Sequence, residues 1–339
     1  MTTASVSTAP AAQQAEQFRE VFARLRQQVE RVFVGQTELI DSVLSALMAD
    51  GHVLIEGVPG LGKTLLVRTL AAATKVAFSR IQFTPDLLPS DIIGTMTLAQ
   101  DPVTGGHDLR FEPGPLVASI VLADEVNRAS PKTQSALLEA MQEHQISVAR
   151  QTVRLPEPFM VLATQNPVEQ EGTYPLPEAQ LDRFLMKVLV SYPSEAEYPL
   201  ILARTTGAQT AAVEPVTDGE EILRMRQVVR QIELSDPVSR YATRLIMATQ
   251  PGSAYAPPRV SREVELGSSP RGLQGLILLG KVRALLDGRF AVSCRDIREI
   301  ALPVLRHRLL LRFEAQAQRV RPDDVLNEVI AAVPENPDR

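Results

Sequence analysis

Apolar residues recur along this chain with two spacings, and each spacing predicts one kind of element. In residues 16–33 the apolar positions Phe18, Phe22 and Leu25 lie three or four residues apart, which is the spacing of an amphipathic helix. A second helix is expected over residues 34–51, which end on a glycine. Elsewhere, short continuous apolar runs are typical of strands that are buried on both faces of a sheet.

Five such runs alternate with helical segments in the first part of the chain. The strands are expected at residues 52–57, 76–83, 118–125, 159–167 and 184–190. The helices are expected at residues 63–73, 85–94 and 130–144. Because strands that alternate with helices usually pair in parallel, this order predicts an α/β fold with helices on both faces of a parallel sheet.

The pattern changes towards the C-terminus. From about Asp218 the periodic segments are nearly all helical, including residues 294–311, and residues 251–270 form a loop-rich insertion. We therefore expect a second, all-helical domain. The predicted organisation is a flexible tail, an α/β domain, a linker and a helical domain, at residues 1–14, 15–192, 193–217 and 218–335.

Composition limits the class of protein. Of the 339 residues, 45% are apolar and 22% are charged, which is ordinary for a globular protein. No apolar run approaches the ~18 residues needed to cross a bilayer, and the small polar residues at the start do not form a signal peptide. The single cysteine, Cys294, cannot form an internal disulfide, which fits a reducing compartment. We therefore expect a cytoplasmic protein that does not insert into membranes.

Charged and metal-binding residues give no reason to expect nucleic acid or zinc. The net charge is −5, and the arginine-rich residues 288–321 also contain Asp296, Glu299 and Glu314. Because the chain has no tryptophan, a platform that stacks single-stranded bases is not expected either. The arginine-rich segment is interpreted as a solvated or inter-subunit helix face. The four histidines lack paired spacing, so Mg²⁺ is the only metal predicted.

A glycine-rich string, GVPGLGKT, follows the first predicted strand and opens a helix. In this context the glycines let backbone N–H groups surround phosphates, and the helix N-terminus adds partial positive charge. Lys63 would contact the β- and γ-phosphates, and Thr64 would ligate Mg²⁺. The alternative is a glycine-rich turn without a ligand. The predicted phosphate-binding residues are Gly57, Val58, Pro59, Gly60, Leu61, Gly62, Lys63, Thr64 and Leu65.

Two carboxylates, Asp124 and Glu125, end the buried run SIVLADE. In open parallel sheets ligands bind beyond the carboxyl ends of the strands, so this pair is expected beside the phosphates. Asp124 would hold Mg²⁺ and its hydration shell, and Glu125 would orient and deprotonate the attacking water. A chance acidic pair is the alternative, but the glycine-rich string upstream favours ATP hydrolysis, with ATP and Mg²⁺ as cofactors.

The order of the remaining polar motifs resembles that of AAA+ ATPases. Asn166 is expected at the end of the strand in VLATQNP, Arg183 at the end of a short helix in LPEAQLDRF, and Arg271 at the start of a helix in GSSPRGLQGL. The resemblance implies that Asn166 is the sensor 1 residue, Arg183 an arginine finger and Arg271 the sensor 2 arginine of a helical lid. It also implies that the adenine packs beside Val34, Gly35 and Gln36.

Longer strings are similar to the MoxR family, and the similarity extends from about Phe18 to Asn327. These strings are ADEVNRASPKTQSALLEAMQEHQISV, ATQNP, PLPEAQLDRF and SPRG, although the last is preceded by serines where an alanine-rich version is expected. The resemblance implies a homo-oligomeric ring, expected to be a hexamer. It also implies client proteins, often with von Willebrand factor A domains, that are remodelled during complex assembly or metal-cofactor insertion.

Two hairpins are expected, at residues 95–115 and 145–155, because turn-like strings there separate short alternating segments. The MoxR resemblance implies that the first is an insert in the second helix of the core and that the second precedes the sensor 1 strand. In that interpretation both would face a pore or a substrate. Plain edge hairpins are the alternative.

Three arginines retain alternative roles. Arg183 would stabilise charge on a neighbour's nucleotide, but it could also be a buried ion-pair partner of Asp182 or Glu178. Arg128 either faces a neighbouring subunit or is a solvated surface residue. Whether Arg271 reaches its own nucleotide or a neighbour's stays open.

The leading hypothesis is an ATP-driven remodelling chaperone of the MoxR type. The motor subunit of a metal chelatase is similar in the same core, and a nucleic-acid motor would show DNA-stimulated hydrolysis that depends on salt. A scaffold gated by nucleotide would bind without turnover. The presence of Asp124, Glu125, Asn166 and Arg183 together favours an enzyme over a scaffold.

Overall fold

The computed structural model describes residues 8–58, 60–100, 107–149, 151–166, 173–206 and 212–335. The chain divides into two compact units. The first unit consists of Gln28–Ile40 and Asp50–Gly219, and the second of Met1–Gln27, Asp41–Ala49 and Glu220–Arg339. Two helices, α1 (Thr8–Val32) and α2 (Thr37–Met48), contribute residues to both units.

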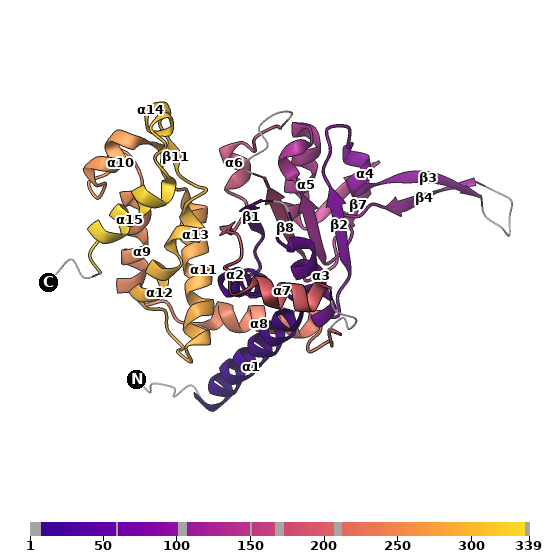
Figure 1. Ribbon diagram of the computed structural model, residues 1–339, viewed down its shortest axis with the longest axis horizontal. Helices are drawn as coiled ribbons and strands as arrows, with labels where there is room; N and C mark the ends of the chain where they lie inside the picture. Colours follow the sequence, from indigo (N-terminus) through magenta and orange to yellow (C-terminus); the bar gives the residue numbers. More distant parts are fainter. Residues whose placement is uncertain are drawn as a thin grey trace, which may run out of the picture. The chain divides into compact units, whose positions relative to one another are not determined.

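A five-stranded sheet forms the centre of the first unit (Figure 1). Across the sheet the strands are β2 (Phe78–Gln82), β5 (Ile120–Asp124), β8 (Met160–Gln165), β1 (Val53–Gly57) and β9 (Met186–Val190). Every neighbouring pair is parallel, so the predicted parallel α/β sheet is confirmed. The carboxyl ends of all five strands therefore lie at one edge, where such sheets bind ligands.

Both faces of the sheet are buried, which explains the continuous apolar runs of its strands. Val121 and Val161 belong to a core cluster that includes residues of helix α5 (Pro131–Glu143). Leu122 and Leu162 are one position further along the same strands, so they point to the opposite face, and they are also fully buried.

Helices and loops of the first unit surround this sheet. Its other helices are α3 (Lys63–Ala73), α4 (Pro89–Ile93), α6 (Glu178–Leu181) and α7 (Tyr198–Thr205), with the 3₁₀ helix η1 (Val126–Arg128). Helix α3 contacts β2 and β5. Helix α7 lies within residues 193–217, the segment expected as a linker.

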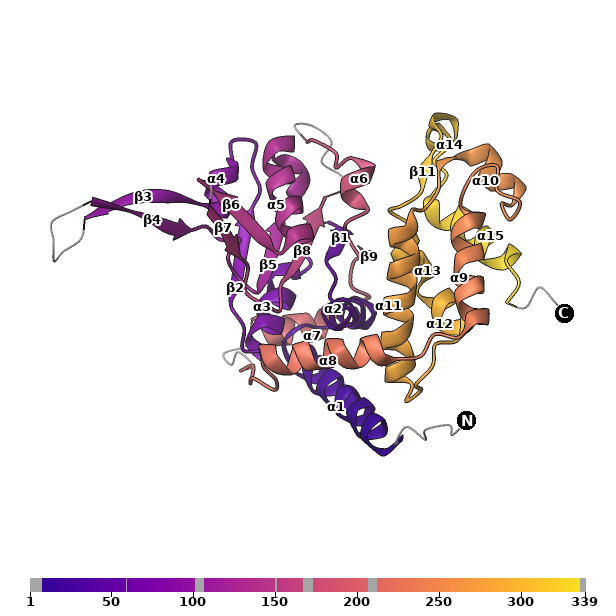
Figure 2. The ribbon, with the colours of Figure 1, turned by 180° about the vertical axis from the view of Figure 1, so that it is seen from behind.

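Two antiparallel hairpins form where the sequence predicts them. Their strands are β3 (Gly94–Gln100) with β4 (His107–Pro113), and β6 (Gln145–Val148) with β7 (Gln151–Arg154). The β3–β4 hairpin extends away from the sheet in both ribbon views (Figures 1 and 2).

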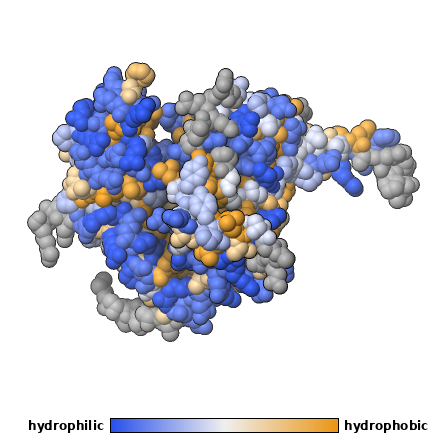
Figure 3. Space-filling view, in the orientation of Figure 1, coloured by the Kyte–Doolittle hydropathy of each residue, from blue (hydrophilic) through white to orange (hydrophobic). Residues whose placement is uncertain are grey.

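The β3–β4 hairpin is amphipathic. Met96 and Phe111 are opposite each other and pack against the core of the first unit. Leu98 and Leu109 form the next pair on the same face, and they are 65% and 68% exposed. The apolar face of the hairpin thus continues from the core into solvent, where apolar surface is visible on the projecting strands (Figure 3).

The second unit is helical, as predicted, with one short antiparallel strand pair. Its helices are α8 (Gly219–Gln231), α9 (Asp236–Ala248), α10 (Pro258–Glu263), α11 (Pro270–Leu286), α12 (Cys294–Glu299), α13 (Ala301–Leu305), α14 (Phe313–Ala317) and α15 (Pro322–Ala332), and its strands are β10 (Val264–Leu266) and β11 (Leu310–Leu311). The expected loop-rich insertion at residues 251–270 therefore also contains α10 and β10.

Two helix predictions near the chain ends need correction. Residues 294–311 were expected to be one helix, but α12, α13 and β11 replace it, because Pro303 has no N–H to continue the helical ladder of α12. The helix expected from Glu16 begins at Thr8, since the alanines and glutamines that precede Glu16 are favourable in helices.

The arginine-rich residues 288–321 are largely matched by carboxylates. Ion pairs join Arg289 to Asp287 and Asp296, Arg295 to Glu299, Arg298 to Glu335, Arg306 to Asp323, and Arg321 to Asp324. Burial alone would raise the pKa of Asp296, but hydrogen bonds from Arg289 and Ser293 lower it overall. Five of the eight arginines of this segment are therefore matched by carboxylates of the same chain, which gives no support to a nucleic-acid surface.

Across the part of the chain that the structure describes, every helix is too short or too polar to cross a lipid bilayer.

Packing around Phe159 gives a test of the first unit's core. Its ring is fully buried, with ring centroids 5.7 Å from His52 and 5.8 Å from His144. Phe159→Ala should lower the free energy of unfolding by about 3–5 kcal/mol through lost burial and the cavity left behind. Urea denaturation followed by circular dichroism measures the change. Leu109→Ala, at an exposed position of the same unit, should stay within about 0.5 kcal/mol of wild type; equal losses in the two variants would contradict the assignment of the core.

Candidate active site

The glycine-rich string joins the carboxyl end of β1 to the first residue of α3. Gly60 and Gly62 have φ values of 84° and 75°, in the left-handed region that glycine adopts readily. Gly62 is the N-cap of α3 and offers no side chain to cap it. The first N–H groups of α3 therefore lack a side-chain cap, which is the arrangement that binds anions at helix N-termini.

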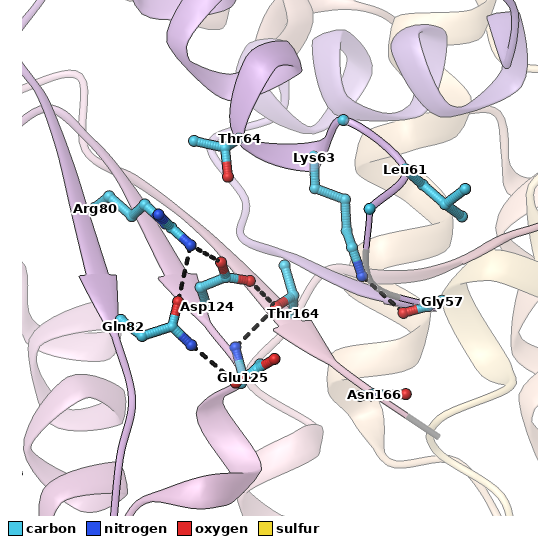
Figure 4. Close-up of a pocket in the computed structure, with 12 residues that line it drawn as sticks. Gly57, Leu61, Lys63, Thr64, Arg80, Gln82, Asp124, Glu125, Thr164 and Asn166 are labelled. Carbon is cyan, nitrogen blue, oxygen red and sulfur yellow. Dashed lines mark hydrogen bonds and ion pairs between the residues drawn. The ribbon is translucent and has the colours of Figure 1, made fainter. Parts of the chain in front are cut away.

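Lys63 is buried within this loop. It is 9% exposed, and its Nζ donates a hydrogen bond of 2.7 Å to the carbonyl oxygen of Gly57 (Figure 4). Burial lowers the pKa of Lys63, and the charges of Asp124 and Glu125 oppose that effect. The ammonium group is thus in the field of both carboxylates.

A cavity of about 230 Å³ lies between the glycine-rich loop and the carboxyl ends of the strands. The predicted residues that line it are Gly57, Gly60, Leu61, Gly62, Lys63, Thr64, Asp124, Glu125 and Asn166. Asn166 directly follows β8 and is 8% exposed. The structure thus brings most of the predicted hydrolytic residues together in one cavity. Val58 lies in the loop, and Pro59 is outside the described residues.

The acidic pair is held by Thr164, in the adjacent strand β8. The hydroxyl of Thr164 donates to Asp124 Oδ1 at 2.6 Å and accepts from the backbone N–H of Glu125 at 2.8 Å. Glu125 has a φ of 57°, because the chain turns out of β5 at this residue. One buried threonine therefore fixes both the Asp124 carboxylate and the turn that carries Glu125.

Three polar side chains that sequence reasoning missed, or placed elsewhere, also contact the pair. Arg80 Nη2 lies 2.7 Å from Asp124 Oδ2 and 2.8 Å from Gln82 Oε1. Gln82 Nε2 and Arg128 Nη1 each lie 2.8 Å from Glu125 Oε2. Arg128, for which a neighbour-facing and a solvated position were both considered, thus contacts its own chain. Figure 4 shows the chain of contacts through Arg80, Gln82 and Glu125.

Arg183 and Arg271 are placed differently from the cavity residues. Arg183 is half-buried just after α6, and its Nη1 donates to the carbonyl of Leu138 in α5. It is outside the set of residues that line the cavity. Arg271 belongs to the second compact unit, where its backbone N–H donates to Ser269 Oγ at the start of α11.

A second, more apolar pocket of about 340 Å³ adjoins the first, since Gly60, Leu61 and Gly62 line both. The predicted base-contacting residues Val34 and Gln36 line it. Pro193, Tyr198, Ile201, Arg204 and Thr205 also line it and were missed because their segment was expected to be a linker, and Tyr192, directly before that segment, was missed as well. Its size and apolar side chains suit a flat aromatic base.

Glu197 fixes the wall of this pocket. Its carboxylate accepts from the N–H and the hydroxyl of Ser194, at 2.6 and 2.8 Å, and from the N–H of Gln36. These hydrogen bonds lower the pKa of Glu197. Gly35 has a φ of 72°, and a Cβ there would lie 1.7 Å from Glu197 Oε1. A residue with a Cβ would displace the Glu197 carboxylate and would also be strained at this positive φ, so the position favours glycine.

Comparison with known proteins agrees with this geometry. Residues 52–186 match the ATPase family associated with various cellular activities (AAA), and residues 257–329 match an AAA lid domain. Fold and site together therefore define an AAA+ ATPase with a C-terminal helical lid. Among its relatives, Chaperone MoxR1 of Mycobacterium tuberculosis is 44% identical over 306 residues, which are 90% of this chain and 80% of the relative. The chain belongs to the MoxR family, and that prediction is confirmed.

Two further proteins show the same similarity over nearly the full length. Protein MoxR of Methylorubrum extorquens is 33% identical over 335 residues, or 94% of this chain and 96% of the relative. A solved structure from Cytophaga hutchinsonii, assigned as an ATPase, has a TM-score of 0.89 at 38% identity and covers 96% of this chain and 98% of its own.

Gly35→Ala tests the pocket beside Glu197. The new methyl group displaces the Glu197 carboxylate from its hydrogen bonds and strains the backbone at a φ of 72°, so nucleotide affinity should fall by about tenfold or more. Fluorescence anisotropy with a labelled ATP analogue measures it. Gly252→Ala is the matched control, because Gly252 has a φ of 82° but no heavy atom within 4 Å of its would-be Cβ. Equal affinities in the Gly35 variant and wild type would exclude this role for the loop.

Proposed function

We propose that this ATPase hydrolyses ATP with Mg²⁺, is completed by a neighbouring subunit in a ring, and uses the energy to remodel partner proteins. The observation that carries the proposal is the single cavity in which Lys63 and Thr64 face Asp124, Glu125 and Asn166. A P-loop lysine after β1 and an acidic pair at the end of β5, at the same edge of the parallel sheet, are the parts that phosphoryl transfer to water requires.

The residues of the cavity suit a metal-bound triphosphate. Lys63 would exchange its bond to the Gly57 carbonyl for bonds to the β- and γ-phosphates. The Thr64 hydroxyl and the Asp124 carboxylate are hard oxygen ligands, which Mg²⁺ prefers, and they line the same cavity. When bound, Mg²⁺ would neutralise charge that develops on the phosphate oxygens.

Glu125 is proposed to orient the attacking water and accept its proton. Its backbone is fixed by Thr164 and its side chain by Gln82 and Arg128, so the carboxylate is held in one position. Such positioning is the main contribution a protein makes to this reaction. Asn166, buried beside the pair, would help to hold the water or the γ-phosphate.

Arg183 is proposed as an arginine finger that acts on a neighbour's nucleotide. It does not line the cavity of its own chain. Its hydrogen bond to the Leu138 carbonyl orients the guanidinium, and this carbonyl is neutral, so the bond does not neutralise the positive charge. This arrangement supports a ring in which hydrolysis depends on assembly, with six subunits as the expected number. Arg271 is proposed as the sensor 2 arginine of the lid.

The partners are proposed to be proteins. A relative named as a chaperone supports remodelling of clients, and the MoxR resemblance favours clients with von Willebrand factor A domains during complex assembly or metal-cofactor insertion. The exposed apolar pair Leu98 and Leu109 on the β3–β4 hairpin supports a client-facing role for that hairpin. With its one cysteine free, the protein is proposed to work in the cytoplasm.

Glu125→Gln separates binding from hydrolysis. The amide keeps the shape of the side chain but cannot accept the proton, so nucleotide affinity should stay within about threefold while kcat falls by ~10² or more. Binding is measured by anisotropy and turnover by phosphate release. Glu143→Gln, at an exposed position on α5, should hydrolyse ATP normally. Wild-type turnover in the Glu125 variant would rule out its role as the base.

Arg183→Ala tests action between subunits. ATP binding should persist while turnover drops by ~10³ or more, because the transition-state charge loses its partner. Mixing this variant with Lys63→Ala, which cannot use its own site but supplies intact arginines, should restore part of the activity. Size-exclusion chromatography checks that mixed oligomers form. Mixed rings without rescue would instead support a structural role for Arg183 within its own chain.

A further inference from the structure

Asp124, the proposed metal ligand, already has a cation beside it. Arg80 Nη2 lies 2.7 Å from Asp124 Oδ2, and the Thr164 hydroxyl occupies the other oxygen at 2.6 Å. Both carboxylate oxygens are therefore engaged within the chain. A divalent ion that approaches Asp124 is repelled by the Arg80 guanidinium, so the two cations compete for the same carboxylate (Figure 4).

The position of Arg80 follows from the pairing of the sheet. Strand β2 lies at its edge, next to β5, and the register pairs Gln82 directly with Asp124. Arg80 is two residues before Gln82, so both side chains project from the same face of β2, and the long arginine reaches along the strand to the carboxylate. The side chain of Asp124 is 16% exposed, whereas that of Arg80 is 46% exposed. The arginine can therefore leave the ion pair and stay solvated.

We propose that Arg80 is a positioning residue that neutralises Asp124 before the metal arrives and leaves it when the metal–nucleotide complex binds. The inference rests on the proposed function, because it assumes that Asp124 is a metal ligand. Arg80 thereby sets the Mg²⁺ concentration at which the nucleotide site fills. Displacing an ion pair costs free energy, so binding of the metal is weaker than an open carboxylate would allow.

A rival role for Arg80 is direct contact with the phosphates, because it lines the same cavity as Lys63. The two roles predict opposite changes on neutralisation. If Arg80 competes with the metal, a neutral residue lowers the Mg²⁺ concentration needed and leaves affinity at saturating Mg²⁺ intact. If Arg80 binds phosphate, a neutral residue weakens nucleotide binding even at saturating Mg²⁺.

The experiment is a Mg²⁺ titration of nucleotide binding, followed by anisotropy of a labelled, non-hydrolysable ATP analogue. Arg80→Gln should lower the midpoint of the titration by about tenfold relative to wild type. Arg80→Lys keeps a cation and should stay near the wild-type midpoint. Arg80→Met serves as a second neutral variant, and circular dichroism confirms that each protein is folded. Arg321→Gln, which removes an exposed ion pair with Asp324 in the other unit, should change nothing.

A double-variant cycle then assigns the effect to Asp124. In an Asp124→Asn background the carboxylate is gone, so Arg80→Gln should no longer move the midpoint. An unchanged or raised midpoint in folded Arg80→Gln and Arg80→Met would overturn the inference while leaving the proposed function in place. If wild-type protein itself binds the analogue equally with and without Mg²⁺, the proposed metal site fails, and the role of Arg80 fails with it.

Discussion

The hydroxyl of Thr164 is the contact on which the geometry of the site depends. Thr164 is the last buried residue of the apolar strand β8, where an unsatisfied hydroxyl would cost about 1–3 kcal/mol, and its hydroxyl both donates to Asp124 and accepts from Glu125 N–H. These bonds require β8 to lie beside β5 in the register that pairs Ala123 with Ala163. The same strand order places β2 on the other side of β5. A change of order would separate the acidic pair from Thr164, Arg80 and Gln82, which belong to the two flanking strands.

Both carboxylates of the site have cationic neighbours of the same chain before any ligand enters. Asp124 and Glu125 are contacted by Arg80 and Arg128, and Lys63 lies in their field. When a polyphosphate binds with its cation, the charged side chains of the site would therefore exchange their present partners for the ligand, and few wholly new charge pairs would form. Because the side chains of Arg80 and Arg128 are partly exposed, their ion pairs with the two carboxylates should weaken as ionic strength rises.

Sequence alone predicted the parts of the site that are local in the chain. The glycine-rich loop around Lys63 and the acidic pair after β5 are continuous strings whose chemistry is fixed by their spacing. Arg80 and Gln82 were missed because polar residues that alternate along a strand usually face solvent, and only the pairing of β2 with β5 turns them towards the carboxylates. The role of Thr164 required the neighbouring strand to be known. Tyr192 and Tyr198 follow the last strand in a segment without a clear period, so nothing local indicated a pocket.

The β3–β4 hairpin has a mechanical consequence. Met96 and Phe111 anchor its base in the same packed core as α5, which follows the acidic pair and η1. A two-stranded ribbon that is anchored at one end transmits a rotation of its base to the residues further along it. A small rotation at its base, produced near the nucleotide, would therefore become a larger sweep at Leu98 and Leu109. Leu98 and Leu109 lie further from the core than the anchoring pair, so the exposed apolar residues would move more than the base does.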